Sequence, residues 1–302
     1  MTLRVATFSQ SSMMIENALR LQSAMADEQI RESSGVISDD FGGYGSTAQH
    51  VINLQVSVTR SQSYIDAATL AGSKVQVMYS AVGSMTDIIT QLRSQLSAAS
   101  TGSSSELTSV INSAQQMLQE MGSLLNTQYD GQYVFAGGKS KAAPVDLTNF
   151  ASGTGSASTA DASYYAGGSE IASVRVATDQ SVSYGVTADN SAFEEIMRVL
   201  KLVANSSSLS SSDITSALDL ASKALDDTSA VQAKLSKAAS QIETASARQS
   251  DYKSFAETLS GDLTSVDLAA ATARLSIYQA QLTASYSALA KIFSMNLASY
   301  LR

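Results

Sequence analysis

The sequence contains no cysteine, one proline and one histidine. Without cysteine, the chain cannot form a disulfide-stapled fold, a thiolate zinc site or a thiol nucleophile. His50 alone cannot complete a zinc site of histidine and cysteine ligands, and any serine–histidine relay would depend on this single residue. Because proline costs a helix interior about 3 kcal/mol, the absence of proline on either side of Pro144 permits very long helices. We therefore expect a non-enzymatic, helix-rich protein.

Charged residues are also scarce, at 15% of the 302 residues, whereas an ordinary globular protein has roughly 25%. Serine, alanine, threonine and glutamine fill the gap, and such short uncharged side chains suit helices that pack closely against other helices. The net charge is −8 and no run of lysine or arginine is present, which argues against nucleic acid as a partner. No run of about eighteen apolar residues predicts a membrane-spanning helix. The first twenty residues lack the apolar segment of a secretory signal peptide, so any export would use another route.

Two long stretches have helical periodicity. In the first, from Ala48 to about Ala98, ten of the fourteen a and d positions of a heptad are apolar, beginning with Val51, Leu54, Val58 and Ile65. In the second, Asp213 is a candidate helix cap, and we expect the helix to run to about Leu259 and to be interrupted at Gly261. Both stretches are typical of coiled-coil seams.

A strict leucine repeat follows at the C-terminal end. Its members are Leu268, Leu275, Leu282 and Leu289, and the stripe continues through Phe293, Leu297 and Leu301. One helix cannot bury its own stripe, and the distant N-terminal end of the chain is the obvious partner. An intramolecular bundle would bury the same leucines. Because uncharged serine, alanine and glutamine flank them, we favour contacts with neighbouring subunits as well, and we assign this stripe, together with Val51, Leu54, Val58 and Ile65, to the assembly interface.

The middle of the chain differs from both ends. Residues 137–190 are rich in glycine, serine and threonine, and residues 173–176 and 182–186 alternate with the period of strands, joined by a hairpin loop at 177–181. The predicted fold is mostly α with a small β-rich insert, and its long N- and C-terminal helices pair as a coiled-coil rod. We expect three domains: 1–40 with 262–302, 41–137 with 190–261, and the insert 138–189.

Three segments carry a resemblance to a known family. These are Leu-Leu-Asn-Thr-Gln-Tyr-Asp-Gly-Gln-Tyr-Val-Phe-Ala-Gly-Gly-Lys at 124–139, Tyr-Tyr-Ala-Gly-Gly at 164–168 and Lys-Ile-Phe-Ser-Met-Asn-Leu-Ala-Ser-Tyr-Leu at 291–301. They are similar to segments of the flagellin superfamily, and within it to the proteins that join the flagellar hook to the filament. The sequence departs from that pattern at Phe41, where those proteins carry proline, and at 234–239, where their "G-A-R-x-N" turn is missing.

The resemblance implies a structural protein of the bacterial flagellum, outside the cell, exported through the flagellar type III apparatus with a cytoplasmic chaperone. It implies a homo-oligomeric ring or helical array in contact with flagellin and another hook-associated protein. It implies no cofactor, and Asp39-Asp40 is a poor calcium site because Phe41–Gly45 supplies almost no ligands. Two alternatives stay open: a short flagellin that forms the filament itself, and a coiled-coil adaptor or translocator unrelated to motility.

Overall fold

The structure is a computed structural model that describes residues 2–100, 104–148, 150 and 156–300, with side chains described for residues 9, 11–100, 105–148, 150 and 156–294. These residues form six α-helices: α1 (Thr2–Ser34), α2 (Ala48–Ala99), α3 (Ser104–Leu125), α4 (Ser191–Ala204), α5 (Ser211–Thr264) and α6 (Leu268–Tyr300). A 3₁₀ helix, η1 (Phe41–Thr47), precedes α2. The prediction of a mostly α fold with long terminal helices is confirmed.

The chain divides into two compact units. Residues 1–59 and 253–302 form the first, which we call the terminal unit, and residues 60–252 form the second, which we call the central unit. Helices α2 and α5 each contribute residues to both units. The three-domain division expected from the sequence stays a prediction.

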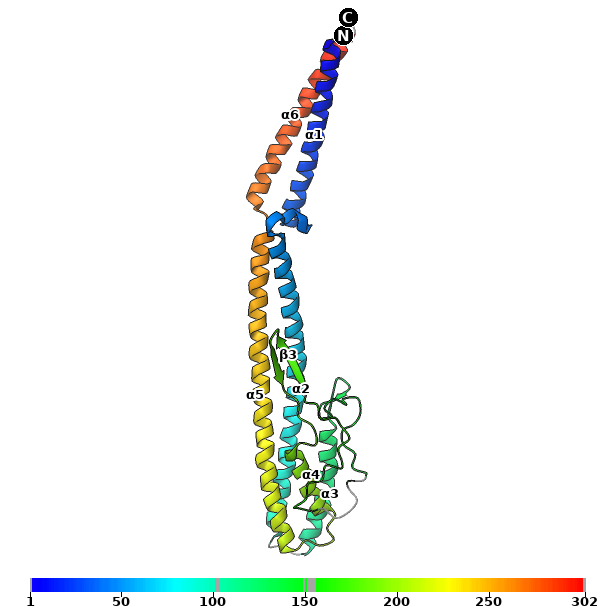
Figure 1. The fold of residues 1–302 in the computed structure, drawn as a ribbon, viewed down its shortest axis with the longest axis vertical. Coiled ribbons are helices and arrows are strands. Elements are labelled where there is room, and N and C mark those ends of the chain that lie inside the picture. Colours follow the sequence, from blue (N-terminus) through cyan, green and yellow to red (C-terminus); the bar gives the residue numbers. More distant parts are fainter. Residues whose placement is uncertain (1, 101–103, 149, 151–155, 301–302) are drawn as a thin grey trace. The chain divides into compact units, whose positions relative to one another are not determined.

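In the terminal unit, α1 and α6 lie side by side and run antiparallel, with the start of α1 beside the end of α6 (Figure 1). The described part of this unit buries few apolar side chains. They are Ala18, Val51, Ala256, Ala271 and Leu289. Three of the five are alanines, so the helices approach closely but leave the larger apolar side chains partly uncovered.

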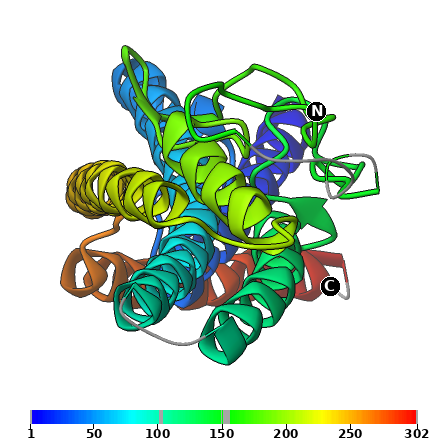
Figure 2. The ribbon, with the colours of Figure 1, turned by 90° about the horizontal axis from the view of Figure 1, so that it is seen from below.

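The central unit contains the continuous hydrophobic core. Helices α2, α3, α4 and α5 all contribute to it, and Figure 2 shows these four helices grouped together when seen end-on. The rings of Phe135 and Phe193 meet edge to face, with centroids 5.7 Å apart. Helix α4 carries this packing because its apolar residues recur on one face and Asn190 caps its first turn, accepting a hydrogen bond from the Ala192 backbone N–H at 3.1 Å.

Two small antiparallel hairpins make up the β structure of the described residues. Strands β3 (Ser173–Ala177) and β4 (Gln180–Ser183) form the hairpin predicted from the alternating residues, with a tighter connection than expected. Strands β1 (Gln128–Tyr129) and β2 (Gln132–Tyr133) flank Asp130 and Gly131, whose φ angles are 51° and 68°. Two positive φ values at the centre of a two-residue loop are typical of the Asp-Gly hairpin turn.

The ends of α5 differ from the sequence prediction. Asp213 lies inside the first turn and accepts from the Ser210 N–H at 3.0 Å, while the Ser210 hydroxyl accepts from the Asp213 N–H at 3.2 Å. Ser210 is therefore the cap, and Asp213 is its reciprocal partner in a capping box. The helix also continues through Gly261 to Thr264, because one glycine costs a helix only about 1 kcal/mol.

Among the described residues, no helix is long and apolar enough to cross a membrane.

Candidate assembly site

Exposed apolar side chains are concentrated in the terminal unit. Sixteen large apolar side chains of the described residues are exposed, and twelve of them belong to this unit. The twelve are Met13, Ile15, Leu19, Ile30, Phe41, Val56, Phe255, Leu259, Leu268, Ile277, Tyr286 and Phe293. A concentration of exposed large apolar side chains in one part of a protein points to an interaction site. The terminal unit is therefore the candidate assembly site.

The predicted leucine repeat is unevenly exposed. Leu268 is 52% exposed and Phe293 is 55% exposed, whereas Leu289 is buried and Leu275 and Leu282 are half-buried. A straight α-helix drifts by about 20° per heptad relative to a seven-residue repeat, so a strict repeat rotates gradually around the helix. The side chain of Leu297 and the whole of Leu301 lie outside the described residues.

The four predicted positions on α2 are wholly or partly covered by other residues of the same chain. Val51 is fully buried, and Leu54, Val58 and Ile65 are half-buried. Ile65 belongs to the central unit and the other three to the terminal unit. Assignment of the α2 and α6 positions to contacts between subunits stays a prediction.

Sequence reasoning missed other exposed apolar residues of the same unit. Ile277 and Tyr286 on α6 and Ile15, Leu19 and Ile30 on α1 are off the leucine repeat. These residues could have been found in the sequence, because they are apolar and lie outside the periodic stripe that a single partner helix could cover. A helix with apolar residues on more than one face needs more than one neighbour.

Polar contacts also join α1 to α6. Glu28 of α1 is only 3% exposed, and its carboxylate accepts from Arg274 of α6 at 3.4 Å and from Arg31 of its own helix at 3.2 Å. One turn away, the Thr272 hydroxyl donates to the Glu32 carboxylate at 3.0 Å. These contacts lie in a helix pair that is otherwise poor in charge.

The segment that follows α1 and the segment that precedes α6 are hydrogen-bonded to each other. The Ile37 N–H donates to the Thr264 carbonyl at 2.8 Å, and the Val266 N–H donates to the Gly35 carbonyl at 2.9 Å. Val36 and Ser265 therefore face each other in an antiparallel bridge. We call this pairing of residues 35–37 with 264–266 the linker bridge. It ties the start of α6 to the end of α1.

In the central unit, the structure brings together two of the segments that carry the family resemblance. The Gly168 N–H donates to the Ala136 carbonyl at 2.9 Å. Gly137 has a φ of +58°, and a β-carbon there would lie 2.1 Å from the Gly168 carbonyl oxygen. The glycines of both segments thus allow the two backbones to approach more closely than side chains would permit.

Asn126 and Tyr164 fasten the same region. The Asn126 side chain donates to the Val145 carbonyl at 2.9 Å and accepts from the Val145 N–H at 3.0 Å, as a neighbouring strand would. The buried Tyr164 hydroxyl donates to the Ala188 carbonyl at 2.9 Å, and burial raises the pKa of Tyr164 far above its usual range. These two motif side chains therefore connect segments of the central unit to one another.

An ionic cluster holds the insert against α4. Lys201 of α4 contacts the Asp161 carboxylate at 2.8 Å and lies 4.3 Å from the centroid of the Phe150 ring. The Asp161 N–H donates to the Glu194 carboxylate at 2.8 Å. The hydrogen bond from Lys201, followed by that from Ser163, lowers the pKa of Asp161 to about 2.

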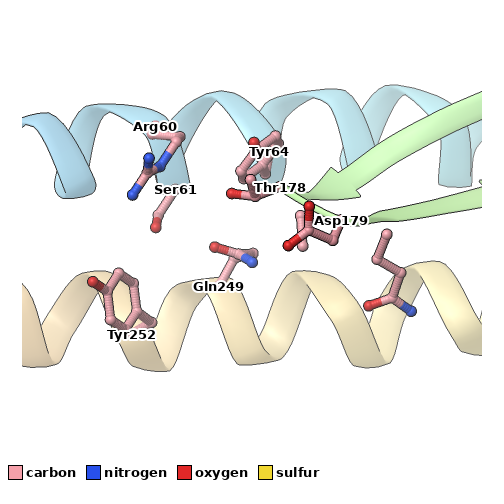
Figure 3. Close-up of a pocket in the computed structure, with 9 residues that line it drawn as sticks. Arg60, Ser61, Tyr64, Thr178, Asp179, Gln249 and Tyr252 are labelled. Carbon is pink, nitrogen blue, oxygen red and sulfur yellow. The ribbon is translucent and has the colours of Figure 1, made fainter.

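The central unit also has an open groove beside the β3–β4 turn (Figure 3). It has a volume of about 440 Å³, and Arg60 and Tyr64 of α2, Gln249 and Tyr252 of α5 and Asp179 of the turn contribute to its lining. These side chains offer hydrogen bonds and both signs of charge. Within the described residues, no group of three or more histidine, aspartate or glutamate side chains is placed to hold a metal ion.

Comparisons with known proteins match both helical ends of the chain. Residues 5–140 match the family model of the bacterial flagellin N-terminal helical region, and residues 218–301 match that of the bacterial flagellin C-terminal helical region. No curated protein matches the sequence at a significant level.

Solved structures similar to the chain include two flagellar proteins. One is a protein from Vibrio parahaemolyticus assigned as a flagellar hook-associated protein, with a TM-score of 0.61, 15% identity and coverage of 75% of this chain and 99% of that chain. The other is Bacillus cereus FlgL, with a TM-score of 0.37, 10% identity and coverage of 82% and 99%. The first likeness shows a shared fold.

Proposed function

The chain belongs to the flagellin family, and we propose that it is the structural subunit that joins the flagellar hook to the filament. The observation that carries this proposal is the contrast between the two units. The central unit has a continuous core of its own, whereas the terminal unit exposes twelve of the sixteen exposed large apolar side chains of the described residues. Such a terminal unit gains its missing burial from neighbouring subunits.

The partners follow from this role. Copies of the chain form a ring or helical array through the terminal unit, with another hook-associated protein and flagellin as neighbours. Each subunit leaves the cell through the flagellar type III apparatus after release from a cytoplasmic chaperone. A sequence without cysteine and with a single proline suits this route, since neither disulfide formation nor slow prolyl isomerisation delays refolding outside the cell.

A short flagellin that forms the filament itself is the second candidate, because it would share the family and the helical ends. The junction role is favoured by the Tyr133–Gly138 segment, which resembles the hook–filament junction proteins. The fold of the Vibrio parahaemolyticus hook-associated protein is compatible with this role. Family membership weighs against the third alternative, an adaptor or translocator unrelated to motility.

Immunogold electron microscopy of intact flagella separates these functions. A subunit that joins hook to filament gives a single band at the hook tip, and a filament subunit gives label along the whole filament. Cells that lack the protein should carry hooks without filaments and release flagellin into the medium. Label elsewhere in the cell, with normal flagella in the deletion strain, would contradict both flagellar roles.

A further inference from the structure

Three contacts along the α1–α6 pair lie at matching positions. The linker bridge joins Val36 to Ser265, Glu32 of α1 accepts from Thr272, and Glu28 accepts from Arg274. Counted from the linker bridge, Glu32 and Thr272 are four and seven residues away, and Glu28 and Arg274 are eight and nine residues away. The two offsets of each pair differ by at most three residues, which is less than one helical turn of about 3.6 residues. All three contacts therefore describe one antiparallel register.

The apolar part of this helix pair specifies the register poorly. Its buried described residues on α1 and α6 are Ala18, Ala271 and Leu289, and a leucine repeat can be displaced by seven residues and meet leucine again. Because small side chains form a smooth surface, a displaced helix would meet few steric clashes.

Glu28 discriminates between registers because it is buried and charged. Arg274 and Lys291 are the only charged residues in the sequence of α6. A displacement by one heptad places either the uncharged Gln281 or the like-charged Asp267 near Glu28 instead of Arg274. Arg31 stays beside Glu28 in every register because both residues belong to α1, so a displacement removes one of two cationic partners. Loss of a cationic partner destabilises a buried carboxylate, so a displaced register is penalised.

We infer that Glu28 and Arg274, with the linker bridge as the starting point, determine the register in which the terminal helices pair. Glu28 and Arg274 thereby make the pairing specific, and the register decides which apolar side chains the terminal unit presents to its neighbours. The inference concerns pairing within one chain and holds equally for a junction subunit and a filament subunit.

The natural absence of cysteine allows a direct test by disulfide cross-linking in the full-length protein. The Glu32→Cys/Thr272→Cys chain reports the observed register, since these two side chains are hydrogen-bonded. The Met25→Cys/Thr272→Cys chain is the matched control and reports a register displaced by one heptad, about 10 Å along the helix. Each pair is oxidised mildly at low protein concentration, and the intrachain disulfide is measured by mass spectrometry.

With Glu28 and Arg274 in place, we expect the first pair to cross-link about tenfold more than the control pair. Glu28→Arg or Arg274→Glu alone should bring the ratio close to one, and the double exchange should restore it. Glu28→Gln, which keeps the shape and removes the charge, should lower the ratio partly. The ratio reports the register even where the helices pair for part of the time.

An unchanged ratio in both single variants would overturn the inference, and so would a double exchange that fails to restore it. A wild-type ratio near one would do the same. Urea unfolding of the central unit should be the same in every variant, because its core contains neither residue.

Discussion

Replacing Leu268 by aspartate should disable assembly while leaving the folded subunit intact. Leu268 is 52% exposed on the first residue of α6, in the terminal unit. Leu70, on α2 in the central unit, is 47% exposed and provides a matched leucine with nearly the same exposure. The two replacements differ in the unit that carries them, so their comparison isolates the contribution of the terminal unit.

The size of the effect follows from the exposed fraction. Full burial of a leucine contributes about 1.5–3 kcal/mol, so a half-exposed Leu268 has about 1 kcal/mol left to gain against a neighbour. Leu268→Ala should then weaken each contact about fivefold. Leu268→Asp should weaken it by about a hundredfold or more, because an unpaired charge enters an apolar contact. Stability of the isolated subunit should change by no more than about 0.5 kcal/mol, as at other surface sites.

The aspartate should not weaken α6 itself. Asp267 already caps this helix, accepting from the Ala269 and Ala270 N–H groups at 3.0 and 3.1 Å, and a further negative charge at a helix N-terminus is favourable. The assay counts hooks without filaments and measures flagellin in the medium for strains that carry Leu268→Ala, Leu268→Asp or Leu70→Asp. Equal, normal filaments in the Leu268→Asp and Leu70→Asp strains would refute the assignment of assembly to the terminal unit.

Three further predictions concern the central unit and the absence of catalysis. Gly137→Ala should lower the free energy of unfolding by about 2 kcal/mol more than Gly131→Ala in urea titrations, since both have positive φ but only the first would place a β-carbon against a backbone carbonyl. Asp161 has a folded-state pKa of about 2, below its unfolded value of 3.8, so its contact with Lys201 stabilises the fold above about pH 4 and is lost as the pH falls to 2. Asp161→Asn should therefore flatten the fall in stability over that window, and an unchanged pH profile would contradict it. His50→Ala should leave motility and filament number unchanged, and loss of filaments with normal export would argue for a role beyond structure.

The helices of the central unit could be predicted because several local signals agree. The apolar periodicity of α2 extends from Ala48 to Ala99 with no proline, and the alternation around Val174 and Val182 identifies the β3–β4 hairpin. The ends of α5 were less predictable. Ser210 and Asp213 both suit a cap, and periodicity does not say which of them precedes the first turn.

The candidate site could be predicted only in part. The leucine repeat identified α6 as a helix that needs a partner, but the exposure of each leucine depends on a drift of about 20° per heptad. Glu28 was out of reach for a different reason. In the sequence it is one of several charged residues on α1, and its partner Arg274 is 246 residues away along the chain.

The two units solve different physical problems with the same restricted set of side chains. The central unit buries phenylalanine, tyrosine, methionine and leucine in one continuous core of its own. The terminal unit buries mostly alanine within the chain and exposes its larger apolar residues, so these residues remain able to pack against other helices. Packing through small and apolar side chains is unselective, because many registers and many partner helices can bury the same apolar surface. Glu28, a buried carboxylate that has Arg31 of its own helix as one partner and finds its second cationic partner, Arg274, on α6 only near the observed register, restores selectivity where the apolar residues provide least of it.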